Sequence, residues 1–123
     1  MNYTRTKKDF KSADGKSISS VEYKPANKAH SAIILVYEIF GITNHIKNLA
    51  IKISESGFIV NIPDIFSRIE ENVSLPYNKQ GFEKGISLKE KIGWQIPVMD
   101  IVASASIYKQ QNYEVYVLGF CFG

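Results

Sequence analysis

The amino-acid sequence predicts an α/β fold in which an N-terminal β-hairpin is followed by parallel strands with crossover helices. Three observations predict it. Asp14-Gly15 is a strong short-range signal for a hairpin turn. Residues 32–37 form a continuous apolar run, and residues 58–62 are apolar except for Asn61, as is typical of strands buried on both faces of a sheet. Between them, apolar residues recur at helical spacing, and strands that alternate with helices pair in parallel through right-handed crossovers.

The hairpin is expected to pair residues 7–12 with residues 17–24. In the second of these segments Val21 and Tyr23 alternate with polar residues, as they should in a half-exposed antiparallel strand. Residues 25–30 then form a loop that leads into the central strand.

A helix is expected between the two apolar runs. Thr43 or Asn44 can cap its beginning, and Gly57 is suited to follow its end. Pro63-Asp64 breaks the strand that comes next. The expected buried stripe of this helix comprises Ile46, Leu49, Ala50 and Ile53.

The second half of the chain is harder to interpret. Residues 67–93 are expected to form a loop with a short helix near residues 82–92. Pro97 can open a further helix that runs to about Gln110, and residues 114–118 form the last strand. The expected apolar face of the last helix comprises Val98, Ile101, Val102, Ala105 and Tyr108.

Composition limits the classes of function. The 123 residues suit a single domain, with a formal net charge of +3 and one cysteine, which excludes an internal disulfide and a Cys-rich zinc site. The scattered lysines lack the interleaved aromatic residues of a nucleic-acid platform, and no apolar run reaches the ~20 residues of a membrane span. The polar N-terminus favours a cytoplasmic protein. No Gly-rich phosphate loop follows a strand, and we expect no cofactor and no metal.

Two motifs at strand ends carry the chemistry. The last five residues, Gly119-Phe120-Cys121-Phe122-Gly123, follow an apolar run and have the Gly-x-nucleophile-x-Gly pattern of a nucleophile elbow. The flanking glycines are expected because side chains there would clash in so tight a turn. Glu38 follows the central strand within Glu38-Ile39-Phe40-Gly41. Because parallel strands end at one edge of a sheet, we expect both motifs at the same ligand-binding edge.

Together with Gly57-Phe58 and Ile62-Pro63-Asp64-Ile65-Phe66-Ser67-Arg68, these two motifs, in this order, resemble the dienelactone hydrolase family. The resemblance implies an α/β-hydrolase fold, and it covers nearly the whole chain but only the N-terminal half of a family member. We therefore expect a partial α/β-hydrolase domain over residues 1–123.

The resemblance also implies a mechanism on a small-molecule lactone or enol ester. Cys121 would attack the carbonyl as a thiolate, and Glu38 would accept the thiol proton. The backbone N–H groups of Ile39 and Phe122 would form the oxyanion hole. Family members complete a triad with a later aspartate and histidine, which the 123 residues do not contain. His30 and His45 do not match the family's histidine, so we expect the chain to be inactive by itself.

Several residues have a second interpretation that the sequence leaves open. Cys121 can be an inert core thiol, and Glu38 a solvated loop carboxylate. Arg68 can orient a carboxylate substrate or lie on the surface. Trp94 and Tyr77 can line a pocket or only pack. Asp64 is expected to cap or turn, and Asp100 to favour the helix dipole.

A different class of function also remains open. Without further strands, the strand at residues 114–118 is an open sheet edge that is apolar on both faces. Such an edge can self-associate or recruit a partner, for example a complementary C-terminal half. The alternative to the hydrolase is therefore a non-catalytic binding protein.

Overall fold

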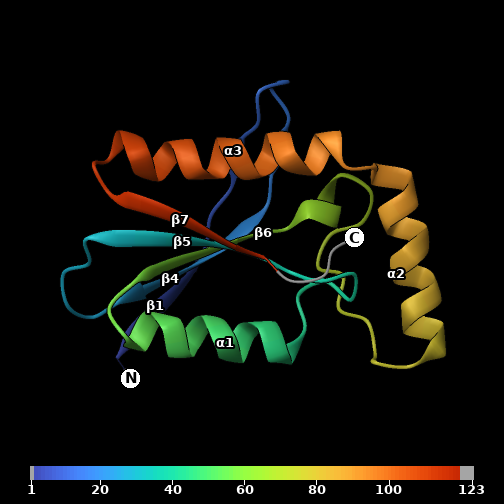
Figure 1. The fold of residues 1–123 in the computed structure, drawn as a ribbon, viewed down its shortest axis with the longest axis horizontal. Helices are drawn as coiled ribbons and strands as arrows, with labels where there is room; N and C mark the ends of the chain where they lie inside the picture. The colour runs from blue at the N-terminus through green and yellow to red at the C-terminus, as the bar shows by residue number, and fades with distance from the viewer. Residues whose placement is uncertain (1, 120–123) are drawn as a thin grey trace.

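The computed structural model describes residues 2–119. One mixed sheet lies between two helices, α1 on one face and α3 on the other, while α2 stands beyond the end of the sheet toward which β5 and β7 point (Figure 1). The strands are β1 (Tyr3–Lys7), β2 (Phe10–Lys11), β3 (Ser17–Ile18), β4 (Ser20–Pro25), β5 (Ser31–Val36), β6 (Ile59–Pro63) and β7 (Glu114–Gly119). The helices are α1 (Asn44–Glu55), the short 3₁₀ helix η1 (Ile65–Arg68), α2 (Lys79–Ile92) and α3 (Gln95–Gln110).

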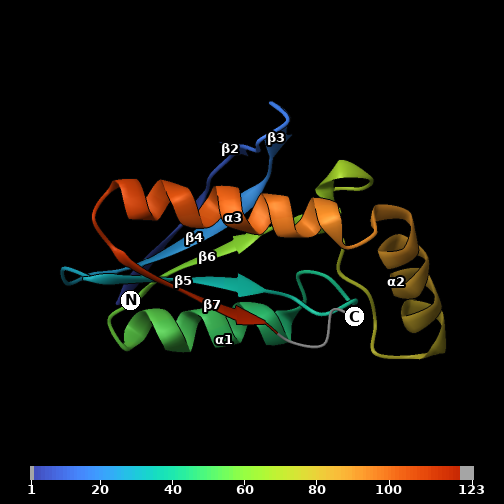
Figure 2. The ribbon, with the colours of Figure 1, turned by 45° about the horizontal axis from the view of Figure 1, so that its top comes forward.

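The five-stranded sheet has the order β1-β4-β6-β5-β7, and Figure 2 shows β4, β6, β5 and β7 side by side in that order. β5 pairs in parallel with both β6 and β7, while β4 is antiparallel to β1 and β6. The predicted α/β architecture of a hairpin followed by parallel strands is therefore confirmed.

The hairpin differs from the prediction at its N-terminal end. Its first strand begins at Tyr3 instead of residue 7, and its ladder is split into β1–β4 and β2–β3. The register is the same on both sides of the split. The interruption lies at Ser19, whose carbonyl oxygen accepts a hydrogen bond from Asp64 N at 2.8 Å instead of from the opposite strand. The hairpin is thereby tied to the end of β6.

The expected stripe of α1 faces the core. Ile46 and Ala50 are fully buried, and Leu49 and Ile53 are partly buried against the same cluster. Thr43 is the N-cap, and its hydroxyl oxygen accepts from Ile46 N at 3.4 Å. Burial of this stripe, more than intrinsic helix propensity, stabilises a helix of this length.

Helix α2 is longer than the sequence predicted. It begins after the cap Asn78, whose side-chain oxygen accepts from Gly81 N at 2.9 Å. Gly81 and Gly85 weaken the helical signal, since glycine costs ~1 kcal/mol relative to alanine in a helix. Gly85 is required by packing, because a Cβ there would lie 2.5 Å from the carbonyl oxygen of Ile39. The backbone of α2 thus approaches the loop after β5 closely.

The expected apolar face of α3 is wrong at two positions. Val98 and Val102 are 49% and 58% exposed, whereas Asp100, Ser104 and Tyr108 point into the protein. The polar side chains can be buried because η1, the sheet and the hairpin supply their hydrogen-bond partners, as described below.

Strand β7 forms an edge of the sheet, and Tyr116, Val117 and Leu118 are each at least 39% exposed. This matches the expected open, apolar edge. Within residues 2–119, no helix is both long enough and apolar enough to cross a bilayer.

Candidate active site

The predicted site lies where β5 and β7 end. The two strands are parallel neighbours in register, with Val36 opposite Gly119. Glu38 follows Val36 by two residues, and in the sequence Cys121 follows Gly119 by two residues. Cys121 and Phe122 lie outside the described residues. Within residues 2–119, a Cβ on Gly119 would make only an ordinary 3.8 Å contact with Val36, so the expected steric need for this glycine finds no support there.

The loop that carries Glu38 is held in place by its backbone. Gly41 N donates to the carbonyl oxygen of Glu38 at 3.0 Å, which closes a tight turn. Ile42 N donates to Val73 O at 2.8 Å, and Leu75 N donates to the carbonyl oxygen of Phe40 at 2.8 Å. The loop after β5 is therefore paired with residues 73–75, which lie far along the chain. The Glu38 side chain itself is half-buried.

Tyr77 contacts the Glu38 carboxylate. Its hydroxyl donates to Glu38 Oε1 at 3.0 Å and lies 2.8 Å from Thr43 Oγ1. The Tyr77 ring packs against Phe40 with a centroid separation of 4.7 Å. Burial, more than the nearby Glu38 charge, raises the pKa of Tyr77, although the bond with Thr43 lowers it. From the sequence, Tyr77 could either line a pocket or only pack, and the structure places its hydroxyl beside the Glu38 carboxylate, the predicted proton acceptor.

Ile39 is 7% exposed, and its carbonyl group faces α2. Among residues 2–119 its N–H group donates no hydrogen bond. Buried N–H groups almost always have a partner, so this donor is suited to a group that the described residues do not supply. Its predicted place in an oxyanion hole stays a prediction.

Arg68 lies in a buried ion-pair cluster. Its Nε donates to Asp100 Oδ2 at 2.9 Å, and its NH2 group donates to Asp100 Oδ1 at 2.8 Å, while NH1 donates to Asp14 Oδ2 at 2.8 Å. Ser12 also donates to Asp100. The hydrogen bonds that Arg68 donates to Asp100 and Asp14 hold the pKa of Arg68 well above its usual value. These contacts make Arg68 a link between η1, α3 and the hairpin, and its expected substrate contact stays a prediction.

Asp100 does not have the expected role at the helix N-terminus. It lies in the second turn of α3, and its side chain is fully buried against Arg68. The carboxylate therefore pairs with Arg68 and does not act at the N-terminus of the helix, where the dipole would favour it.

The Asp14–Arg68 pair predicts a specific loss of stability in acid. The bond from Arg68, followed by that from Lys16 N, lowers the pKa of Asp14 from 3.8 to about 2. A lowered pKa in the folded state means that the stabilisation is complete above pH 3.8 and is lost as the pH falls through about 2. The difference in urea midpoint between the wild type and Asp14→Asn should stay constant down to that range and then shrink. A difference that persists undiminished at pH 2 would contradict this assignment.

Asp64 anchors the loop after β6, as a turn residue would. It is buried, accepts from the Tyr37 hydroxyl at 2.8 Å, and accepts from Asn72 N at 2.9 Å. Burial raises its pKa above the usual value, and the bonds from Asn72 and Tyr37 oppose that shift. It precedes η1, but its side chain does not cap that helix.

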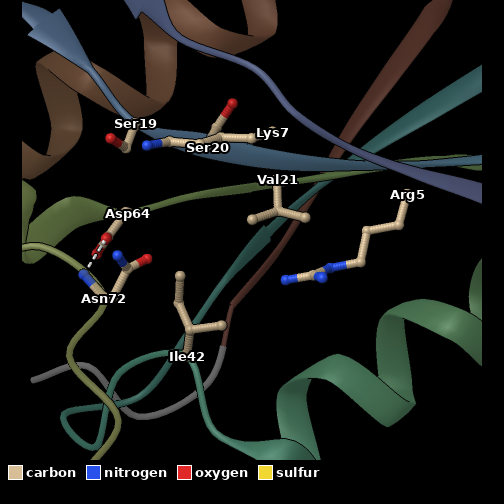
Figure 3. Close-up of a pocket in the computed structure, with 8 residues that line it drawn as sticks. All are labelled: Arg5, Lys7, Ser19, Ser20, Val21, Ile42, Asp64 and Asn72. Carbon is tan, nitrogen blue, oxygen red and sulfur yellow. Dashed lines mark hydrogen bonds between the residues drawn. The ribbon is translucent and has the colours of Figure 1, made fainter.

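Asp64 also lines a small cavity of about 130 Å³ between the hairpin and the loops after β5 and β6. Figure 3 shows the Arg5 guanidinium pointing into the space between Val21 and Ile42, with Asp64 facing Asn72. Glu38 and Ile39 are not among the residues that line it. This cavity is therefore separate from the predicted ester site.

A second polar network lies beneath α3, and the sequence did not reveal it. Asn61 Nδ2 donates to Ser20 Oγ at 3.0 Å and to the Tyr108 hydroxyl at 3.1 Å, while Ser104 donates to Asn61 Oδ1 at 3.0 Å. The Tyr108 hydroxyl in turn donates to Glu22 Oε2 at 2.6 Å. Burial, reinforced by Glu22, raises the pKa of Tyr108. The spacing of Asp100, Ser104 and Tyr108 at i, i+4 and i+8 was the signal available for this polar helix face.

The two histidines lie outside this arrangement. His30 is exposed in the loop before β5, at the end of that strand away from Glu38, and His45 is exposed in the first turn of α1. Trp94 is 72% exposed at the start of α3. Within residues 2–119, no group of three or more His, Cys, Asp or Glu side chains could hold a metal ion.

Known proteins resemble this chain in sequence and in fold. The carboxymethylenebutenolidases of Rhodococcus opacus and Pseudomonas putida are 28% and 23% identical to it over 91 and 118 residues, or 74% and 93% of this chain. A crystal structure from Klebsiella pneumoniae subsp. pneumoniae, of a protein assigned by its name to the dienelactone hydrolases, superposes with a TM-score of 0.79 at 21% identity over 98% of this chain.

The chain spans 34% and 50% of the two relatives and 51% of the Klebsiella chain, so it corresponds to about half or less of each. The structural likeness shows the fold of the α/β hydrolases that resemble dienelactone hydrolase. The sequence model of the Dienelactone hydrolase family matches residues 18–123. With most of its length matched by that model, the chain belongs to the dienelactone hydrolase family.

Proposed function

We propose that this chain is the nucleophile-bearing part of a hydrolase that cleaves a lactone or enol ester through Cys121. The observation that supports this most is the register of β5 and β7. Val36 lies opposite Gly119, so the segments that lead to Glu38 and to Cys121 leave adjacent strands at the same level. Neighbouring strands are about 4.8 Å apart, and Cys121 can lie at most about 7.6 Å from Gly119 between Cα atoms.

In the proposed reaction the Cys121 thiol gives its proton to the Glu38 carboxylate, and the sulfur forms a bond to the substrate carbonyl carbon. The carbonyl π electrons move to oxygen, where the N–H groups of Ile39 and Phe122 stabilise the negative charge. The tetrahedral intermediate collapses with cleavage of the bond to the ring or ester oxygen, which leaves as an enolate or alkoxide and takes the proton back from Glu38, so that Glu38 is ionised again. Water then hydrolyses the thioester to a carboxylate.

The last step lacks a base within these 123 residues. His30 and His45 are the only histidines of the chain. His30 is exposed before the start of β5, at the end of that strand away from Glu38, and His45 is exposed in the first turn of α1. We therefore expect these residues to form the thioester and to release it very slowly. The curated relatives are named for a carboxymethylene-substituted butenolide, an unsaturated lactone. A small ester of this class is the proposed substrate, and the cytoplasm is the proposed location.

A burst experiment tests the proposal. Mixing the chain with p-nitrophenyl acetate should release about one equivalent of p-nitrophenol per chain, followed by little turnover, because the acyl group stays on the sulfur. Cys121→Ala should abolish the burst, a loss of at least about 100-fold in rate. Thermal unfolding of both proteins checks that the variant is folded. An undiminished burst in Cys121→Ala would refute the proposal.

The open edge of β7 favours a second candidate. Tyr116, Val117 and Leu118 are exposed on a strand that has one unpaired side within residues 2–119, and such an edge can pair with another copy or with a complementary C-terminal half. In that case the chain is a non-catalytic binding protein. Absence of the burst, together with concentration-dependent association in sedimentation, would favour this candidate over the hydrolase.

A further inference from the structure

We propose that Tyr77 is a positioning residue for Glu38, holding one carboxylate oxygen and leaving the other open to accept a proton. This inference rests on the proposed function, because it assigns a role within that site. Neither the family resemblance nor the motifs at the strand ends single out Tyr77. Its contacts alone connect it to the site.

The direction of the hydrogen bonds follows from the number of available protons. The ionised carboxylate of Glu38 can only accept, so the single Tyr77 proton is donated to Glu38 Oε1. The 2.8 Å contact between Tyr77 and Thr43 must then use the Thr43 proton. Thr43 Oγ1 is free to donate it, because this oxygen accepts from Ile46 N at the start of α1. The result is a directed chain from the α1 N-terminus through Thr43 and Tyr77 to Glu38.

The Tyr77 ring is fixed from a second side. It packs on Phe40 at 4.7 Å, and Phe40 lies two residues after Glu38. The backbone pairing between Phe40 and Leu75 holds the segment that leads to Tyr77 against the loop that carries Glu38. The hydroxyl is therefore placed by the same pairing that places its acceptor, although the side chain is 57% exposed.

Within residues 2–119, no other side chain holds the Glu38 carboxylate. The ion pairs formed there involve Glu22, Asp14, Asp100 and Glu70, and none involves Glu38. With Oε1 engaged by Tyr77, Oε2 has no hydrogen-bond partner within that range. An orienting donor on one oxygen and an open second oxygen is the arrangement that a positioned proton acceptor needs.

The test compares acylation rates by p-nitrophenyl acetate in the wild type, Tyr77→Phe, Glu38→Gln and the double variant, from pH 6 to 9. Phenylalanine keeps the contact with Phe40 and removes only the hydroxyl. We expect Tyr77→Phe to slow acylation about three- to tenfold, a modest loss because this hydrogen bond is exposed to solvent. In the Glu38→Gln background, Tyr77→Phe should not change the acylation rate. The pH profiles of Glu38→Gln and of the double variant should therefore superimpose.

Tyr113→Phe is the matched control. Tyr113 packs against Tyr108 just before β7, at the end of the sheet away from Glu38, and its acylation rate should equal that of the wild type. The inference is overturned if Tyr77→Phe acylates as fast as the wild type while Glu38→Gln is slow, or if Tyr77→Phe slows both backgrounds equally. If Glu38→Gln itself acylates at the wild-type rate, the proposed role of Glu38 fails first, and the role of Tyr77 fails with it.

Discussion

Replacing Asp100 with alanine should lower the free energy of unfolding by about 3–5 kcal/mol, because it leaves a buried guanidinium without its main partner. The side chains of Asp100 and Arg68 are 0% and 8% exposed, and two parallel hydrogen bonds join them. Removing the carboxylate also deprives Ser12 of its acceptor. A loss of this size is a large fraction of the stability of a small domain.

Urea unfolding followed by circular dichroism measures this effect. Asp14→Ala is the matched control, because it removes the other carboxylate on Arg68 at a position that faces solvent. Its unfolding midpoint should shift far less than that of Asp100→Ala. Equal shifts for the two variants would show that the buried contact is not the one that stabilises the cluster.

Replacing Gly41 with alanine should cost about 2–5 kcal/mol and slow the proposed acylation as well. Gly41 has a φ of +81°, where an L side chain costs ~1–2 kcal/mol, and overpacking adds ~1–3 kcal/mol. A Cβ at this position would lie 2.1 Å from the carbonyl oxygen of Val73, which accepts from Ile42 N. The methyl group would therefore push the loop of Glu38 and Ile39 away from residues 73–75.

Gly15 separates the two contributions. It has a φ of +86°, but nothing lies within 4 Å of a Cβ built there. Gly15→Ala should therefore cost only the conformational strain of ~1–2 kcal/mol and leave acylation unchanged. If the two glycine variants lose equal stability, close approach to Val73 is not what requires Gly41.

The parts of the fold predicted correctly from the sequence are those whose signals are local. The Asp14-Gly15 turn, the apolar runs of β5 and β6, and the stripe of α1 each identify an element from its own residues. The alternation of strands with helices was sufficient to predict that β5 pairs in parallel with its neighbours.

The errors have long-range causes. In α3, apolar residues were expected inside, but Asp100 finds Arg68 and Ser12, which are 32 and 88 residues away in the chain. In α2, Gly85 weakens the helical signal but is needed for packing against the loop after β5. No pattern within either helix reveals such partners.

The residues of the candidate site likewise include some with a local sequence signal and one without. Glu38 and Ile39 were predicted as site residues from the resemblance carried by a motif at a strand end, and the structure places that motif at the end of β5 beside β7. Tyr77 could not be assigned, because its contact with Glu38 joins residues 39 positions apart across an irregular loop. Its role depends on the pairing of residues 73–75 with the loop after β5, which side-chain periodicity does not encode.

Peptide mapping of the chain after brief exposure to p-nitrophenyl acetate tests most directly whether the ends of β5 and β7 form one acyl-transfer site. The account predicts an acetyl thioester on Cys121 that forms at least about 100-fold more slowly in Glu38→Gln. An acetyl group found on lysine or serine residues instead, or on Cys121 at the same rate with and without the Glu38 carboxylate, would contradict it.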